Sequence, residues 1–250
     1  MTVAGIIPAR FKSTRFPGKP LADIGGRPMI QYVYERARRA ARLDRLLVAT
    51  DDSRIVEAVR RFGGEVLYTS PDHASGTDRL AEAGRLLGLL DDDIVVNIQG
   101  DEPLVEPVMI HRLIEALESS PEYPMATLAF RSASRADYLN PNIVKVVVDC
   151  RGRALYFSRS PIPAYRDAGE KFEFFRHLGF YAYRHAFLQT FTGLPAGILE
   201  EAEKLEQLRA MEHGYGILVA PSPVETQGVD TPEDLAKLMT LLPEERPLKE

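Results

Sequence analysis

The chain has 250 residues, of which 45% are hydrophobic and 27% charged, so a sizeable core can form without disulfides or structural metals. Its net charge is −5, from 31 basic and 36 acidic residues, which argues against a general nucleic-acid-binding surface. Cys150 is the single cysteine, so an intrachain disulfide is excluded, and we assign this residue no role. The sequence shows neither a signal-peptide pattern nor the ~20-residue apolar run of a membrane helix, so we expect a cytoplasmic protein.

The first 130 residues alternate between strand-like and helix-like patterns. Short, branched apolar runs predict buried strands at 3–8, 46–50, 66–68, 94–98 and 125–130. Amphipathic segments between them predict helices at 28–41, 53–62, 77–90 and 106–118. Ser75 and Asp78 have the spacing of a capping box at the start of the third helix. This alternation predicts a mostly parallel sheet flanked by helices.

The pattern changes after residue 140. Residues 144–148 and 154–157, on either side of Arg151-Gly152, predict an antiparallel hairpin. Further segments predict a strand at 177–183, a helix at 200–213, a strand at 217–220 and a helix at 232–242. We therefore predict one α/β domain, 1–250, with a β-rich insertion at about 140–185.

The stretch after the first strand predicts a phosphate-binding loop. It carries four cations among small residues: Arg10, Lys12, Arg15 and Lys19. Glycine and small residues free backbone N–H groups, and together with cations these suit a polyphosphate. A solvated loop without special function is about equally compatible with this composition, but ligands of open α/β sheets bind beyond the carboxyl ends of strands. Pro20 follows Gly18-Lys19, so the kinase-type loop is absent, and no glycine fingerprint of a dinucleotide site follows the strand.

Two aspartates occupy similar places on other strands. Asp101 follows the strand 94–98, and Asp230 lies in the loop after the strand 217–220. Carboxylates near a phosphate-binding loop suit Mg²⁺, although each could instead cap the helix that follows it. Because these strand ends meet at one edge of the sheet, we expect both aspartates to converge on one crevice.

Other polar residues are ambiguous from the sequence alone. His177 begins a predicted strand, and a lone histidine is more often structural than catalytic. Glu206 and Gln207 lie away from the apolar stripe of the predicted helix 200–213, which is typical of a solvated face.

Several segments, taken in order, resemble the 3-deoxy-manno-octulosonate (Kdo) cytidylyltransferase family over residues 3 to about 235. They are I-I-P-A-R-F-K-S-T-R-F-P-G-K-P, D-H-A-S-G-T-D-R, N-I-Q-G-D-E-P, N-P-N-I-V-K-V-V, Y-F-S-R-S-P-I-P, R-H-L-G-F-Y-A-Y, E-K-L-E-Q-L-R and G-V-D-T-P-E-D-L. The first and third also occur across sugar nucleotidyltransferases, whereas R-H-L-G-F-Y and E-Q-L-R are more specific for Kdo.

The resemblance implies a Rossmann-like nucleotidyltransferase fold and the reaction of CTP with Kdo to give CMP-Kdo and pyrophosphate, with Mg²⁺, in lipopolysaccharide biosynthesis. It implies that Arg10, Ser13 and Lys19 hold the triphosphate, and that Ser75, Arg79 and Gln99 surround the cytidine and the reacting centre. It assigns the metal to Asp101 and Asp230, and the sugar to Arg159, His177, Tyr181, Glu206 and Gln207. Arg10, Lys19, Asp101 and Asp230 are then the catalytic candidates, and the family implies a homodimer that contacts through the insertion.

The resemblance also predicts the mechanism: in-line attack of the anomeric hydroxyl of Kdo on the α-phosphorus, with Arg159 and His177 offsetting the sugar carboxylate. Two alternatives stay open. The chain could activate another sugar acid, for instance a sialic acid, or it could be a non-catalytic nucleotide-binding regulator with the same fold. An NAD-dependent oxidoreductase is disfavoured by the missing glycine fingerprint.

Overall fold

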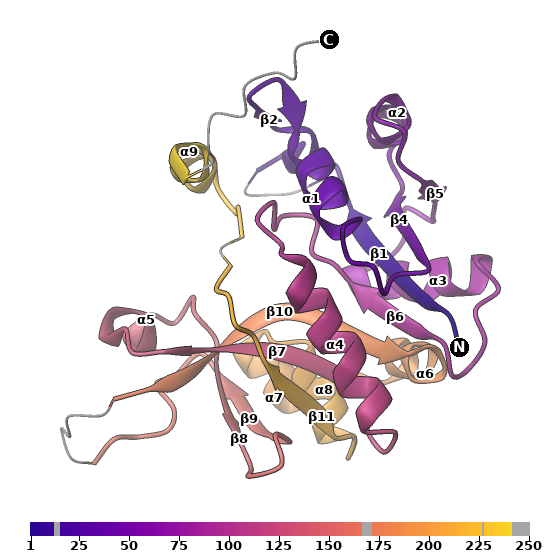
Figure 1. Cartoon of the computed structure of the whole chain (residues 1–250). Coiled ribbons are helices and arrows are strands. Elements are labelled where there is room, and N and C mark those ends of the chain that lie inside the picture. Colours follow the sequence, from indigo (N-terminus) through magenta and orange to yellow (C-terminus); the bar gives the residue numbers. More distant parts are fainter. Residues whose placement is uncertain (13–15, 167–171, 227, 242–250) are drawn as a thin grey trace.

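A nine-stranded sheet with helices on both faces forms the centre of the protein (Figure 1). The computed structural model describes residues 1–12, 16–166, 172–226 and 228–241. Along the main path the strand order is β11-β7-β10-β6-β1-β4-β5. These strands are β1 (Val3–Ala9), β4 (Arg45–Thr50), β5 (Val66–Tyr68), β6 (Ile94–Asn97), β7 (Met125–Ser132), β10 (Phe174–Arg184) and β11 (Ile217–Pro221).

The predicted parallel sheet is confirmed. β1 pairs in parallel with β4 and β6, β4 with β5, and β11 with β7, whereas β10 runs antiparallel to both β6 and β7. The strands are almost wholly apolar because both faces are covered. The reversed strand β10 is important for the site, because its early residues lie at the edge where the neighbouring strands end.

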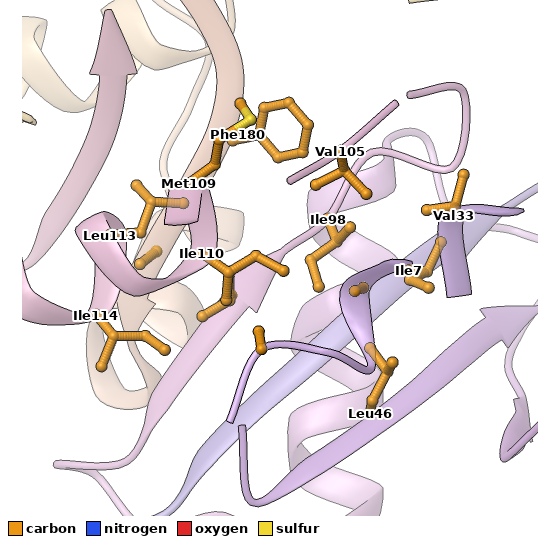
Figure 2. Close-up of a cluster of buried hydrophobic side chains, with 14 of the residues drawn as sticks. Ile7, Val33, Leu46, Ile98, Val105, Met109, Ile110, Leu113, Ile114 and Phe180 are labelled. Atoms are coloured by element: carbon orange, nitrogen blue, oxygen red, sulfur yellow. The ribbon is translucent and has the colours of Figure 1, made fainter. Parts of the chain in front are cut away.

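One face of the sheet is covered by α1 (Met29–Ala37), α2 (Ser53–Arg61) and α4 (Pro107–Ser119). Figure 2 shows part of the apolar cluster that fills this layer, with Ile110 and Leu113 from α4, Val33 from α1 and the strand residues Ile7 and Leu46. These side chains are at most 8% exposed. A core of this density positions the strand ends rigidly, since interiors are packed like organic crystals.

The opposite face is covered by α3 (Gly76–Leu86), α6 (His185–Gly193) and α8 (Gln207–Glu212). Ser75 caps α3 in a capping box with Asp78, as the spacing predicts. The α6 segment was not predicted as a helix, nor was the short α5 (Arg135–Leu139). α9 (Pro232–Leu241) begins at a proline, which suits the first helical turn.

The predicted helix 200–213 is wrong as a single element. α7 (Ile198–Glu203) ends at Lys204, whose φ of 54° is left-handed, and α8 begins at Gln207. Leu205 and Leu208 are both buried, so the break lets the chain turn while the apolar residues stay in the core. A non-glycine residue in this conformation costs about 1–2 kcal/mol, which the surrounding packing must offset.

The β-rich region also differs from the predicted insertion at 140–185. β8 (Lys145–Val148) and β9 (Ala154–Ser158) form the predicted hairpin, and β8 pairs with the start of β10. β10 then continues between β7 and β6, so its second half belongs to the central sheet. Within the described residues, no helix combines the length and apolarity needed to cross a membrane.

Two short strands, β2 (Asp23–Ile24) and β3 (Arg27–Pro28), form a separate hairpin before α1. The sequence also predicts a polar loop at 164–174, and residues 167–171 of it lie outside the described residues.

Candidate active site

Lys19 lies where three loops meet at the carboxyl edge of the sheet. Its Nζ is 2.7 Å from Asp101 Oδ2 and 3.2 Å from Asp230 Oδ1. Lys19 begins a 3-10 turn after β1, Asp101 follows β6, and Asp230 precedes α9. The main chain joins the last two loops, because Val229 N donates to Asp101 O at 2.8 Å. The two aspartates therefore converge on one crevice, as their positions after strands predict.

The loop after β1 is closed at its base. Gly18 N donates to Phe11 O at 2.9 Å, and the Phe11 ring lies directly beside Gly18. Gly18 has a φ of 73°, a conformation that glycine adopts without cost. Arg10 reaches the neighbouring loop, where its Nη1 donates to Ala74 O at 3.2 Å. Ser13, predicted to hold phosphate, lies outside the described residues.

A cavity of about 700 Å³ opens beside this loop. Its lining includes Arg10, Ser75 and Glu206, which come from three distant segments. Thr77 Oγ1 donates to Glu206 Oε2 at 2.6 Å, so the start of α3 is tied to the start of α8. The cavity thus joins residues that the resemblance assigns to the nucleotide with one that it assigns to the sugar.

Arg79, which the resemblance places around the cytidine and the reacting centre, has a completely buried side chain. Its guanidinium donates to Thr69 Oγ1 and, at 3.4 Å, to Ser70 O, and Nη2 lies 3.2 Å from Asp51 Oδ1. Burial lowers the pKa of Arg79, and the Asp51 carboxylate opposes that shift. Arg79 therefore braces the segment that leads to Ser75.

The reversed strand β10 brings His177 and Tyr181 to the same edge. Tyr181 pairs with Asn97, the last residue of β6, and an irregularity between Leu178 and Tyr181 interrupts the pairing with β7. Gln99 Nε2 donates to the carbonyl of Gly179 in that irregularity at 2.7 Å. A parallel strand in this position would place these side chains at the far edge of the sheet.

A cavity of about 450 Å³ lies over these residues. Asp101 and Asp230 form one side of it, and His177, Tyr181 and Gln207 line it as well. The metal-binding candidates and the sugar-binding candidates thus face one space. Gln207 is 5% exposed, and its Nε2 has no hydrogen-bond partner within the described residues.

Burial sets the protonation states of this cavity wall. It lowers the pKa of His177 to about 3, so the imidazole is neutral at pH 7 and binds as a hydrogen-bonding group. The expectation that His177 offsets the sugar carboxylate by charge stays a prediction, which burial opposes and which the charge of a bound carboxylate would favour. Its Nε2 lies 2.9 Å from Thr127 Oγ1, which fixes the ring. Burial also raises the pKa of Tyr181, whose hydroxyl stays protonated.

Glu206 and Gln207 lie at the break between α7 and α8 and not on a solvated helix face. Burial raises the pKa of Glu206, while the hydrogen bond from Thr77 opposes that shift. The sequence pattern suggested exposure because it was interpreted as one continuous helix, and the left-handed residue Lys204 changes which way the following residues face.

Arg159 lines a third and larger cavity of about 1140 Å³, to which Asp230 also contributes. Its guanidinium donates to Glu203 O at 2.7 Å, to Pro141 O at 3.1 Å and to Lys204 O at 3.4 Å. Arg159 thus brings a positive charge to this cavity, while several of its donors are held by main-chain carbonyls.

Two further residues belong to the site although the sequence patterns did not single them out. Glu102 lines the 450 Å³ cavity, and burial, followed by the charge of Asp101, raises its pKa to about 8. Arg176 lines both the 450 Å³ and the 1140 Å³ cavity and pairs with Glu225. In the sequence, Glu102 directly follows Asp101 and Arg176 directly precedes His177. Such adjacency by itself does not distinguish a residue of the site from a mere neighbour.

The arrangement suits the transfer of a phosphorus group between two anionic molecules. Arg10 lines the 700 Å³ cavity, and Arg159 lines the 1140 Å³ cavity to which Asp230 contributes. Lys19 contacts the two carboxylates that line the 450 Å³ cavity. Among the described residues, no three or more His, Cys, Asp or Glu side chains are grouped to hold a metal by themselves. Asp101 and Asp230 nevertheless fit Mg²⁺, which is commonly held by one or two carboxylates together with substrate phosphates.

Comparison with known proteins agrees with this geometry. A sequence model of the family described as "Cytidylyltransferase" matches residues 4–219. A 3-deoxy-manno-octulosonate cytidylyltransferase of Syntrophobacter fumaroxidans is 66% identical over 97% of both chains. An 8-amino-3,8-dideoxy-manno-octulosonate cytidylyltransferase of Shewanella sp. (strain W3-18-1) is 55% identical over 95% of this chain and 97% of its own.

Solved structures give the same picture. A CMP:2-keto-3-deoxy-manno-octonic acid synthetase complexed with CTP superposes with a TM-score of 0.90 at 47% identity, covering 96% of this chain and 98% of the other. A 4-diphosphocytidyl-2C-methyl-D-erythritol synthase, at 13% identity and a TM-score of 0.65, shares the fold and covers 96% and 97%. With the sequence match spanning most of its length, the chain belongs to the cytidylyltransferase family.

Proposed function

We propose that the protein transfers CMP from CTP to Kdo. The anomeric hydroxyl of Kdo attacks the α-phosphorus, the bond to the β-phosphate bridging oxygen breaks, and pyrophosphate leaves. The hydroxyl proton passes to solvent or buffer, so the products are CMP-Kdo and pyrophosphate. Such a transfer asks the protein mainly for positioning and for charge stabilisation.

The observation that carries the proposal is the shared cavity of about 450 Å³. Asp101 and Asp230, which contact Lys19 from the phosphate-binding loop, line it together with His177 and Tyr181 of β10. In-line transfer needs the nucleophile to lie about 3–3.5 Å from the phosphorus. The nucleotide-binding and sugar-binding parts of the site must therefore open into one space.

The relatives support the substrate class. Proteins 52–66% identical to this chain are named for 3-deoxy-manno-octulosonate, and others at 53–55% are named for its 8-amino analogue. Both sugars are octulosonates with a carboxylate, so they share the features that Arg159 would recognise. The higher identity of the Syntrophobacter relative favours the 8-hydroxy sugar.

We propose that Asp101 and Asp230 hold Mg²⁺ during the reaction. Each presents a carboxylate oxygen to the same cation, the Lys19 ammonium, so the two oxygens are already directed toward one point. When bound, the metal would neutralise phosphate charge and stabilise the leaving oxygens.

The chain's own residues address the repulsion between the substrates. One like-charge pair ~4 Å apart costs about 4 kcal/mol at an effective dielectric of 20, which corresponds to nearly three decades in rate. Arg10 and Lys19 offset the phosphates, and Arg159 offsets the sugar carboxylate. His177, being neutral, orients the sugar through a hydrogen bond, and its ring is fixed by Thr127.

A pyrophosphate-release assay tests the function. The enzyme, CTP and Mg²⁺ are mixed with Kdo, its 8-amino analogue, N-acetylneuraminate or no sugar. We expect turnover with Kdo to exceed turnover with the other acids. Faster turnover of N-acetylneuraminate would establish the sialic-acid alternative, and CTP binding without pyrophosphate release from any acid would establish the regulator.

We further propose a homodimer in the cytoplasm. Leu139 of α5 and Leu155 of β9 are 65% and 56% exposed, and such exposed apolar side chains suit a contact with a second copy. Light scattering of the purified chain tests this, and a monomer at micromolar concentration would contradict it.

A further inference from the structure

Lys145 is a buried lysine just behind the cavities of about 1140 and 450 Å³, which are called the sugar-side cavities below. It is 0% exposed and is the first residue of β8, within the segment N-P-N-I-V-K-V-V. It is absent from the lining of either sugar-side cavity. A buried charge is costly unless its hydrogen-bonding capacity is satisfied, so its partners indicate its function.

All three donors of the ammonium have main-chain partners. Nζ donates to Asn140 O at 3.0 Å, to Ile143 O at 2.7 Å and to Arg159 O at 2.5 Å. An ammonium has three N–H groups and no acceptor, so the group is saturated. Hydrogen bonds from a charged donor are about twice as strong as neutral ones. Burial lowers the pKa of Lys145, while the charge of Glu203 opposes this shift.

These partners form the wall of the site. Residues 140–143 line the larger cavity, and Asn142 and Ile143 also line the smaller one that holds His177 and Asp101. Lys145 ties both ends of this short segment to one atom. Inside the segment, Ile143 N donates to Asn140 O at 3.1 Å and Asn142 N donates to Asn140 Oδ1 at 2.9 Å, and the Lys145 ammonium joins this turn to Arg159.

The same atom fixes Arg159. Lys145 accepts no bond but donates to the Arg159 carbonyl, while Glu203 Oε2 accepts from the Arg159 N–H at 2.9 Å. The peptide groups on both sides of the Arg159 Cα are therefore held by buried or half-buried charges. The guanidinium then donates back to Pro141 O at 3.1 Å, which links the two held segments to each other.

We propose that Lys145 is a positioning residue for the octulosonate half of the site. It acts through Arg159 and residues 140–143, without contacting the sugar. This inference deepens the proposed function, since it assumes that Arg159 binds the sugar acid. Loss of Lys145 then weakens sugar binding selectively, because the residues around CTP are anchored elsewhere, by Lys19 and the capping box of α3.

The test compares Lys145→Met, which keeps an unbranched side chain one atom shorter and removes every donor, with Lys145→Gln, which keeps two donors. Arg151→Met is the matched control, because it removes an exposed cation at the tip of the same hairpin. Initial rates of pyrophosphate release give kcat and the KM values for Kdo and CTP. Hydrogen exchange of the amides of residue 140 and residues 142–144 is measured without substrate.

We expect Lys145→Met to raise the KM for Kdo at least tenfold and the KM for CTP less than twofold, with a smaller rise in Lys145→Gln and none in the control. Hydrogen exchange of the amides of residue 140 and residues 142–144 should become faster, while the amides of α3 stay protected. An unchanged KM for Kdo in both variants, or equal rises in both KM values, would overturn the proposal.

If Lys145→Met does not fold, the KM values and the amide exchange of Lys145→Gln test the proposal by the same criteria. If the wild-type protein turns over no octulosonate, the proposed function fails by itself. The exchange measurement still tests Lys145 in that case, because unchanged exchange in a folded variant would show that the ammonium does not hold the wall.

Discussion

Lys19 Nζ and Asp101 Oδ2 lie 2.7 Å apart although 82 residues separate them in the chain. The side chain of Lys19 is 14% exposed and that of Asp101 is 31% exposed, so the pair is only partly screened by solvent. It connects the loop after β1 to the loop after β6, two strands that are neighbours in the sheet. The pair therefore joins the phosphate-binding loop to the proposed metal site.

Asp101→Ala should abolish transfer while the protein stays folded. If Asp101 holds Mg²⁺ as proposed, its removal takes away several kcal/mol of charge stabilisation, so we expect kcat/KM to fall about 100-fold or more. Circular dichroism and thermal melting check the fold, since a partly exposed ion pair contributes only ~1 kcal/mol or less. Near-normal turnover in the folded variant would remove Asp101 from the metal site.

Arg159→Ala should weaken the use of Kdo more than the use of CTP. A charge-assisted hydrogen bond contributes about 1.5–3 kcal/mol, so the KM for Kdo should rise roughly tenfold or more. Steady-state kinetics with each substrate varied in turn measures this. Arg153→Ala, in the turn between β8 and β9, is the control, and an unchanged Kdo saturation curve in Arg159→Ala would place Arg159 outside the site.

Gly18→Ala should impair CTP binding. The added Cβ would lie 3.0 Å from Phe11 Cζ, in a left-handed conformation that costs an L-residue about 1–2 kcal/mol. Gly26→Ala is the matched control, because Gly26 has a φ of 87° with no atom within 4 Å of the new Cβ. Both variants should lose some stability, but only Gly18→Ala should raise the KM for CTP. Equal kinetics in the two variants would contradict a role for the closed base of the loop.

His177 should make stability fall in acid. Its pKa is about 3 in the folded protein, against about 6.5 in an unfolded chain. Between these values the unfolded state binds the extra proton, so stability decreases as the pH falls from about 6.5 toward 3, by at most about 1.4 kcal/mol per pH unit.

Urea unfolding of the wild type and of His177→Gln at several pH values isolates this contribution. The difference in unfolding free energy between the two proteins should change with pH below about 6.5 and be constant above it. A constant difference throughout would mean that the imidazole titrates normally in the folded state.

The sequence by itself determined the layered α/β plan. Apolar strand runs alternate with amphipathic helices from residue 3 to about 130, and a short buried strand followed by an amphipathic helix has few other ways to bury its surface. The loop with Lys19 and the aspartates after strands followed from the same plan, because parallel strands end at one edge. The capping box of Ser75 and Asp78 was predicted from local spacing, since such a cap depends only on residues near each other.

Only the tertiary structure decided the sugar side of the site. The direction of β10 depends on pairing with β6 and β7, which are distant in sequence, and this direction brings His177 to the carboxyl edge. The left-handed turn at Lys204 places Glu206 at the 700 Å³ cavity and Gln207 at the 450 Å³ cavity. No local sequence pattern predicted this turn. The pKa of His177 and the saturated ammonium of Lys145 likewise arise from burial by remote segments. Burial and strand direction are properties of the assembled chain, so the family resemblance could name His177, Glu206 and Gln207 but not their states, and no sequence pattern singled out Lys145.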